Sequence, residues 1–276
     1  MKNNFSRTST SDFLLRYLSI LYIGIMIIIP IAGIVSEALQ GSIATLWASI
    51  VSPQALFSLK LTFISALIIV FINIFTGTVT AWVLVRYTFP FKHIMDGLID
   101  LPFAIPTIVT GIMLVTLYGP KSFMGDLFGK YGIEIMFNQP GIILALLFVT
   151  FPFVVRSVQP VLLEMEQDIE EAAKTLGASS FTIFMRIVLP SLIPSILTGA
   201  AFSLSRVLGE FGSIVIVAGN IPLKTQVASV YIYGEIESYN NQGALGLSLF
   251  LLLISLLILI FLNFLQTWSM SHERAT

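Results

Sequence analysis

Six long apolar runs divide the sequence, and shorter polar stretches separate them. Each run is long enough to cross a hydrocarbon layer of about 30 Å at a helical rise of about 1.5 Å per residue. Because backbone groups in lipid must find hydrogen-bond partners within the protein, the pattern predicts an all-α, polytopic bundle of transmembrane helices. We expect six spans, at residues 14–36, 57–85, 98–118, 141–158, 191–218 and 244–268.

Two of these runs carry signs of interruption. The third contains Pro102 and Pro106 near its start, which predicts a kink or a delayed helix start, because proline removes a backbone donor. In the fifth run Gly209 and Gly212 flank Glu210, which predicts a break or hinge toward the outer end of that helix.

The sequence contains no linker, low-complexity segment or repeat of fixed period, so it predicts one membrane domain. We divide it into residues 1–56 (tail, first span and a stretch at the outer interface), 57–268 (five spans with the polar loop 156–190) and 269–276 (C-terminal tail). Basic residues precede the first run, as they do in signal peptides. That run is too long for a cleaved signal and lacks a small-residue cleavage site, so we expect it to remain as the first span.

Composition supports this class and excludes several functions. The chain is 56% hydrophobic and 11% charged, with a mean hydropathy of +0.94. A net charge of −1 provides no basic field for nucleic acid. The absence of Cys removes thiolate metal sites and cysteine nucleophiles, and two His residues argue against a histidine metal cluster. No phosphate-binding G-x-x-x-x-G-K-[ST] loop is present, so we expect a chain that is not an enzyme, with no catalytic residue, metal or cofactor of its own.

Positive charge is unevenly distributed over the two sides of the predicted bundle. Nine basic residues lie on one side, at Lys2, Arg7, Arg16, Arg86, Lys92, Arg156, Lys174, Arg186 and Arg274. Four lie on the other side, at Lys60, Lys121, Lys130 and Lys224. The positive-inside rule therefore predicts that both termini and the loop 156–190 lie in the cytoplasm.

The loop 156–190 is the longest charged segment of the chain, and its centre has helical features. Asp168 and Glu171 have the D-x-x-E spacing of a capping box, which predicts a short helix beginning near Ile169. Gly177 is placed to end this helix in a left-handed conformation. The short helix can be a solvated connector or a docking surface for a partner protein.

A second helix is expected directly after the glycine. Ser179 or Ser180 can cap a helix over residues 181–188, and Pro190 would mark the turn into the fifth span. Ala172 and Ala173, side by side in the first helix, favour docking, because small side chains let another protein's backbone approach closely.

A family resemblance bears on this choice. The loop contains the pattern E-A-A-x3-G-x9-I-x-L-P, carried by Glu171, Ala172, Ala173, Gly177, Ile187, Leu189 and Pro190. It resembles the signature of ABC-importer permeases of the type I (MetI-like) fold, in which the short helix is a coupling helix that docks into a groove of the ATP-hydrolysing subunit. The resemblance implies that Glu171 faces a basic residue of that subunit, and that Ala172, Ala173 and Gly177 pack closely against it.

Further stretches are similar to the T-type subunit of sulfate/thiosulfate permeases. They are residues 86–92, 101–107, 152–162, 208–212 and 219–225. The chain departs from that family at Phe91, where Gly is usual. Molybdate permeases share the Gly-Glu-Phe-Gly element, so a molybdate or tungstate permease is the nearest alternative. T-type chains also occur in some algal plastids, so the resemblance implies a bacterial cell (inner) membrane or a plastid envelope.

The resemblance also implies the partners. A dimer of ATP-binding cassette subunits would carry ATP and Mg²⁺, and a W-type chain would be the second permease subunit. An external sulfate-binding protein would dock on the outer loops at residues 121–139 and 219–243. The rival from another class is a secondary anion transporter with Glu210 as proton carrier, which would leave the E-A-A-x3-G pattern without a role.

Charged residues within the fifth run give the second candidate site. Arg206 and Glu210 stand at i and i+4 on one helical face, at the end of a small and polar stripe that includes Ser195, Gly199 and Ser203. In one interpretation the two charges neutralise each other and the small residues allow close helix packing. In the other, the stripe lines the translocation path and Arg206 attracts an oxyanion. The sequence leaves both interpretations open.

Overall fold

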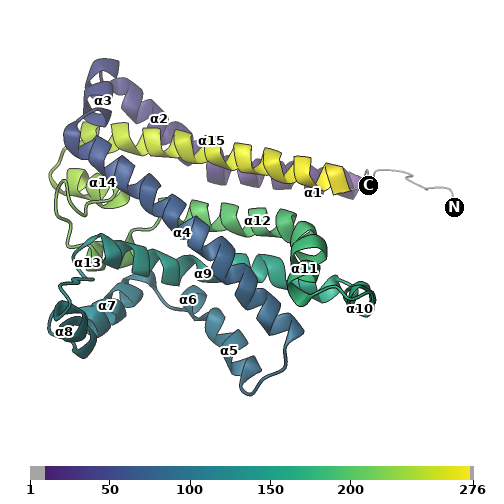
Figure 1. Cartoon of the computed structure of the whole chain (residues 1–276). Helices are drawn as coiled ribbons and strands as arrows, with labels where there is room; N and C mark the ends of the chain where they lie inside the picture. Colours follow the sequence, from purple (N-terminus) through teal and green to yellow (C-terminus); the bar gives the residue numbers. More distant parts are fainter. Residues whose placement is uncertain (1–9, 274–276) are drawn as a thin grey trace.

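The computed structural model describes residues 10–273, and its regular elements are helices (Figure 1). The long helices are α1 (Thr10–Ile23), continued through the π-helical turn η1 (Gly24–Ile28) into α2 (Ile29–Gln40), α4 (Pro53–Arg86), α9 (Gln139–Glu164), α12 (Leu189–Leu208) and α15 (Asn241–Glu273). The shorter elements are α3 (Ile43–Ile50), α5 (Lys92–Ile99), α6 (Leu101–Ala104), α7 (Thr107–Tyr118), α8 (Phe123–Gly129), α10 (Gln167–Thr175), α11 (Ser180–Ile183), η2 (Phe184–Val188), α13 (Gly212–Val217) and α14 (Ala228–Glu237).

Among residues 10–273, five helices are long and apolar enough to cross a membrane, and a sixth span exists if one bent pair is counted as one span. The predicted all-α bundle is therefore confirmed. The predicted C-terminal tail is helical through Glu273 as part of α15. Three basic residues that entered the charge count, Lys2, Arg7 and Arg274, lie outside the described residues.

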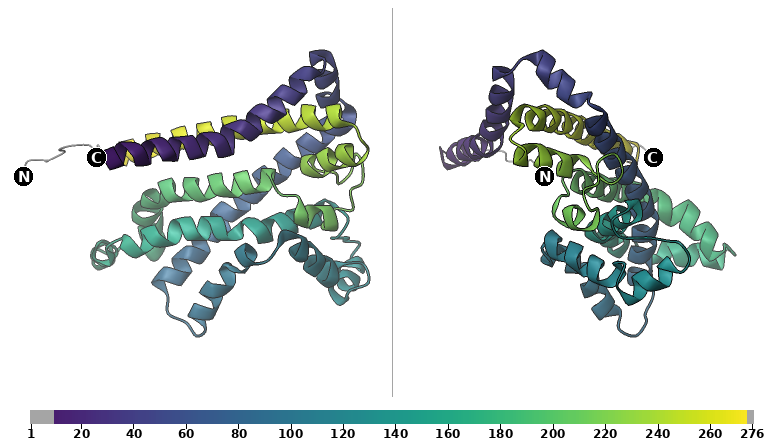
Figure 2. Two further views of the ribbon diagram at one scale, coloured as in Figure 1. Left: turned by 180° about the vertical axis from the view of Figure 1, so that it is seen from behind. Right: turned by 90° about the vertical axis from the view of Figure 1, so that its left-hand side faces the viewer.

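The centre of the bundle consists of α4, α9 and α12, each of which packs against the other two. On one side α1, α2 and α15 run alongside each other, and on the other side lie α5 to α8 (Figure 1). The loop helix α10 projects from one end of the bundle. Figure 2 shows that α1 begins and α15 ends at this same end.

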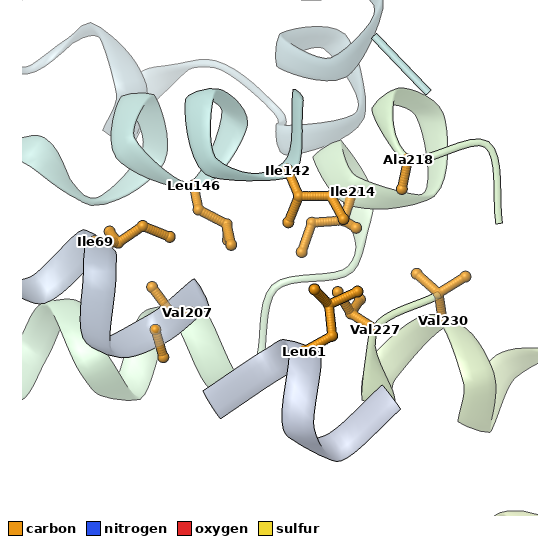
Figure 3. Packing of buried hydrophobic residues seen from close by; sticks show 10 residues of the cluster. Leu61, Ile69, Ile142, Leu146, Val207, Ile214, Ala218, Val227 and Val230 are labelled. Atoms are coloured by element: carbon orange, nitrogen blue, oxygen red, sulfur yellow. The ribbon is translucent and has the colours of Figure 1, made fainter. Parts of the chain in front are cut away.

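The core fills the space between the three central helices. Leu61 and Ile69 of α4 point toward Ile142 and Leu146 of α9 and Val207 of α12 (Figure 3). Small residues let these helices approach closely: a Cβ atom at Gly199 of α12 would lie 2.6 Å from the Val154 Cα atom of α9.

This close approach predicts the effect of Gly199→Ala. The added methyl group would meet the backbone of α9, which cannot move aside as a side chain tip would, so we expect a loss of about 1–3 kcal/mol in stability. The apparent Tm of the detergent-solubilised protein should fall by several degrees. Gly33→Ala in α2 is the matched control, because no atom beyond its chain neighbours and its own helix backbone lies within 4 Å of its Cβ position. Equal Tm values for the two variants would contradict this packing.

The third predicted span is broken. Helices α5 and α6 form one arm and α7 the other, with a 114° bend between them. The kink expected from Pro102 and Pro106 is confirmed, and the segment expected over residues 98–118 is a bent pair of helices rather than one straight helix. The cause is local: a residue before proline avoids helical geometry, and Ile105 is accordingly extended, with φ −89° and ψ 128°.

The fifth span differs from the prediction at its start and agrees at its end. The α12 helix ends at Leu208 and the chain resumes as α13 at Gly212, which confirms the expected break. At the other end, the segment 181–188 is not a separate helix, because α11, η2 and α12 form one continuous helix over Ser180–Leu208. Pro190 therefore does not mark a turn. It lies within this continuous helix, two residues after the wider π-helical turn η2, where the local change in backbone spacing accommodates a residue without an N–H.

The departure from the family pattern at Phe91 has a structural counterpart. Phe91 precedes α5 in a left-handed conformation, with φ 63°. Glycine adopts this conformation without a steric cost, whereas a side chain makes it less favourable by about 1–2 kcal/mol. The turn before α5 is therefore formed with a strained residue.

Candidate functional site

The loop helix α10 ends as its sequence predicts. Gly177 has φ 86°, and its N–H donates to the Lys174 carbonyl oxygen at 2.9 Å. The Ala178 N–H donates to the Ala173 carbonyl oxygen at 3.0 Å. This pair of hydrogen bonds is a Schellman motif, which requires a left-handed residue at the position of Gly177. Ser179 then caps α11 by accepting from the Thr182 N–H at 3.2 Å.

The start of α10 differs from the prediction. The helix begins at Gln167, and its N-cap residue, Glu166, makes no capping hydrogen bond with its side chain. The predicted capping box of Asp168 and Glu171 is therefore wrong. Because the chain is extended only at Met165 and Glu166 after α9, the helix restarts early and Asp168 falls within its first turn. There its charge favours the helix N-terminus without a cap.

One residue that the sequence analysis did not single out anchors α10 to the bundle. Glu170 is buried, and its Oε1 accepts from Arg86 Nε at 2.9 Å and lies 2.7 Å from Arg86 Nη2. Arg86 is the last residue of α4. The signal was present as a lone basic residue at the end of a span, opposite a loop with five acids, but the pairing depends on tertiary structure.

The four predicted coupling residues divide between two faces of α10. Glu171, Ala172 and Gly177 are exposed, whereas Ala173 is half-buried and packs against the protein's own core cluster, which includes Ile183. Large apolar side chains lie exposed around the same helix, at Ile169, Leu176 and Phe181, and Leu176 is 89% exposed. The exposed face of α10 and its flanks therefore combines an acid, small residues and uncovered apolar groups.

The anchoring role of Glu170 can be tested against its neighbour. Glu170→Ala would leave Arg86 as a buried charge without its partner, and breaking such a pair costs about 3–5 kcal/mol. We expect α10 to detach, so that trypsin cleaves the solubilised chain at Lys174 much faster. Glu171→Ala, which removes an exposed carboxylate one residue away, should leave the cleavage rate unchanged. Equal rates for the two variants would show that the ion pair does not hold the loop.

A second ionic cluster fixes α5 against α9. Arg156 of α9 donates from Nε to Asp100 Oδ1 at 2.7 Å and from Nη2 to Asp100 Oδ2 at 2.8 Å. Its Nη1 also donates to Asp96 Oδ1 at 2.7 Å. Paired donation of this kind holds a guanidinium in a defined orientation. The cluster was missed, although the i, i+4 spacing of the two acids was a visible signal.

Arg206 and Glu210 form an ion pair in the interrupted fifth span. Arg206 Nη2 lies 2.7 Å from Glu210 Oε2. The other carboxylate oxygen, Oε1, accepts from the N–H and the Oγ of Ser213, each at 2.9 Å. Glu210 is 1% exposed on its side chain and Arg206 34%. The carboxylate thus caps α13 within the protein, while a third of the Arg206 side chain is exposed.

The small residues of the predicted stripe lie elsewhere. Ser203 is fully buried, and its Oγ donates to the Thr150 carbonyl oxygen of α9 at 3.3 Å. Gly199 lies against Val154 of the same helix. These residues form the packing seam between α12 and α9, and Ser203 shares no open surface with Arg206.

Solved structures with the same arrangement of helices are ABC importers. The crystal structure of a bacterial ABC transporter involved in the import of the acidic polysaccharide alginate matches with a TM-score of 0.78 and 18% identity, over 93% of this chain and 96% of that chain. The bacterial alginate transporter in complex with alginate pentasaccharide-bound periplasmic protein matches with a TM-score of 0.75 and 18% identity, over 92% and 93%. The fold is therefore that of an ABC-importer permease.

The sequence identifies the family. The model for the binding-protein-dependent transport system inner membrane component matches residues 73–272, and the chain belongs to this family. A probable sulfate transport system permease protein cysT of Chlorokybus atmophyticus is 44% identical over 250 residues, which cover 91% of this chain and 87% of that protein. The sulfate transport system permease protein CysT of Escherichia coli is 39% identical over 249 residues, covering 90% of each. The chain is thus a multi-pass membrane protein and a transport component, not an enzyme.

Proposed function

We propose that this chain is the membrane-spanning subunit of an ATP-driven importer for sulfate or thiosulfate. The relatives that support this substrate match about nine-tenths of the chain, including the interrupted span and the loop with α10. An ATP-driven importer needs a phosphate-binding loop and this sequence contains none, so the proposal assigns ATP hydrolysis to a partner subunit.

The observation that carries the proposal is the way α10 is connected to the rest of the protein. Its outer face is exposed at Glu171 and Ala172, while its inner face is tied to α4 through Glu170. Beyond Gly177, one unbroken helix runs from Ser180 to Leu208. A partner pressing on α10 would therefore move both α4 and the helix that bears Arg206. This connection converts motion at the loop into motion at the span, as alternating access requires.

The partners follow from this mechanism. A dimer of ATP-binding cassette subunits, which hold ATP and Mg²⁺, would receive α10 in a groove, with Glu171 facing a basic residue. A W-type chain would be the second permease subunit. An external sulfate-binding protein would dock at the opposite end, where α8 and the outer loops enclose a surface hollow of about 600 Å³ lined by Lys130, Glu134 and Lys224.

Within the path, Arg206 would supply positive potential for the anion. The pair with Glu210 occupies one guanidinium nitrogen, and a third of the side chain remains exposed. Partial neutralisation by Glu210 keeps the attraction weak, which suits a transporter because tight binding would slow release. Ser203 is assigned to helix packing in this proposal.

The proposed orientation places α10 in the cytoplasm of a bacterial cell, or on the equivalent side of a plastid envelope. The described basic residues Arg16, Arg86 and Lys174 support it, because they lie at the same end of the bundle as α10. Both termini would then be cytoplasmic.

Two other functions are the alternatives to this proposal. A molybdate or tungstate permease would use the same machinery with another oxyanion. A gradient-driven transporter would need Glu210 as a proton carrier, yet Arg206 and Ser213 already occupy both of its oxygens.

The substrate is tested by competition in vesicles that contain the full set of subunits. Excess unlabelled thiosulfate should suppress uptake of radiolabelled sulfate, whereas an equal concentration of molybdate or tungstate should leave most of it. Preferential uptake of molybdate would favour the alternative permease.

A further inference from the structure

Three phenylalanine rings from three different helices form a continuous row. Phe153 of α9 stands in the middle, with its ring centroid 5.1 Å from that of Phe103 in α6 and 6.4 Å from that of Phe202 in α12. Phe103 is 51% exposed and Phe202 is 53% exposed. The row therefore lies on the surface of the chain and ties together the elements that the fold brings around α9.

Each of the three phenylalanines has a charged residue three or four positions away, on the same helical face of its own segment. Asp100 precedes Phe103 by three residues and Arg156 follows Phe153 by three. Arg206 follows Phe202 by four. Side chains three or four positions apart share one helix face, so these charged groups border the row.

The charges lie on opposite sides of the row. Helix α9 runs toward the α10 end of the bundle, whereas α5, α6 and α12 run away from it (Figure 1). The Arg156–Asp100 cluster therefore lies on the α10 side of the rings, about 5 Å along the helix axis, and Arg206 lies about 6 Å beyond them on the other side. Along the direction of the spans, the surface therefore has a charged zone at Arg156 and Asp100, then the aromatic row, and then a second charged zone at Arg206.

This surface does not fit a lipid-facing one. Arg206 is 34% exposed on its side chain and Asp100 49%, and ionised groups that face hydrocarbon are costly. Charged residues within spans face a bundle interior or a water-filled path. Apolar side chains between two polar zones of such a path form a barrier to hydrated ions, because a narrow apolar segment expels water.

We propose that Phe103, Phe153 and Phe202 form the apolar gate of the translocation path, closing against the corresponding surface of the second permease subunit. The inference rests on the proposed function, because it takes the path to carry a hydrated oxyanion. Phe153 and Phe103 belong to elements that Arg156 fixes to each other through Asp96 and Asp100. Phe202 instead stands on the continuous helix that begins at Ser180, beside α10. Because α12 is packed tightly against α9 at Gly199 and Ser203, movement of α10 would carry the row as a unit away from the second permease subunit and open the gate.

The gate is tested by passive leak through the assembled complex in vesicles without ATP. Phe202→Ala and Phe153→Ala should raise the efflux of chloride and of radiolabelled sulfate by about tenfold or more, on the scale at which losing one large apolar side chain shifts an equilibrium. Phe202→Leu, which keeps the position apolar, should leak less than Phe202→Ala. Phe71→Ala is the matched control, because Phe71 of α4 is 75% exposed and outside the row. Wild-type leak in both alanine variants would overturn the proposal.

A second measurement covers variants that fail to assemble. The natural sequence has no Cys, so Phe202→Cys creates the only thiol of the chain. A membrane-impermeant anionic thiol reagent should modify Phe202→Cys much faster than Phe71→Cys if the row borders a water-filled path, and equal rates would overturn the gate. ATP-driven sulfate uptake by the wild type separates the two hypotheses. If the alanine variants leak chloride but the wild-type complex takes up no sulfate, the gate is supported and the proposed substrate is wrong. If the wild type takes up sulfate normally but the alanine variants do not leak, only the gate is wrong.

Discussion

Glu171→Lys should abolish ATP-driven sulfate uptake, by about 100-fold or more, because juxtaposing like charges at an interface costs several kcal/mol and each 1.4 kcal/mol is a factor of ten. The carboxylate is exposed on the outer face of α10 and makes no contribution to the anchoring of that helix, which depends on Glu170. The lysine would face the basic partner residue that the proposal assigns to the ATPase groove. We expect normal membrane insertion and an unchanged Tm of the isolated chain.

Two measurements separate lost coupling from lost folding. Co-purification with the ATPase subunit should fail for Glu171→Lys and succeed for Glu164→Lys, which makes the same charge change at an exposed position at the end of α9. Transport by Glu164→Lys should stay close to that of the wild type. Normal uptake by Glu171→Lys would remove the coupling role from this face of α10.

Arg206→Gln should reduce uptake to a similar extent while also destabilising the protein. Glu210 would keep a buried charge without its partner, which costs about 3–5 kcal/mol. Its two hydrogen bonds from Ser213 would remain, so α13 keeps its cap. The expected readouts are a lower Tm and a loss of sulfate uptake.

The double variant Arg206→Gln/Glu210→Gln distinguishes the two roles of the pair. Removing both charges relieves the buried carboxylate, so Tm should recover most of the loss. Uptake should stay low, because the positive potential in the path is gone. Recovery of uptake together with Tm would show that the pair is structural and that the anion does not depend on Arg206.

The sequence was sufficient where a single physical requirement determines the pattern. Spans were located because lipid demands about twenty apolar residues in a row. Pro106 and the glycines at 209 and 212 marked the breaks because proline and glycine act on the backbone locally. Gly177 was identified as a helix stop for the same reason, and its left-handed conformation confirms this.

Features that depend on how distant segments pack together could not be predicted from the sequence. Glu170 and Glu171 are equivalent as sequence, and only the position of Arg86 at the end of α4 determines which of them turns inward. The capping box predicted at Asp168 is wrong because α10 begins only two residues after α9 ends. The turn predicted at Pro190 is wrong because the π-helical turn η2 lets the helix continue through the proline. The aromatic row joins residues up to 99 positions apart, from Phe103 to Phe202, and no local pattern reveals it.

The central claim is that this chain moves sulfate only when a partner hydrolyses ATP. The direct measurement is uptake of radiolabelled sulfate into vesicles containing this chain, alone or with its ATPase, second permease subunit and binding protein. The complete set should accumulate sulfate with Mg-ATP and stop with a non-hydrolysable analogue, and the chain alone should accumulate none under a proton or sodium gradient. Gradient-driven uptake by this chain alone, without ATP, would contradict the account.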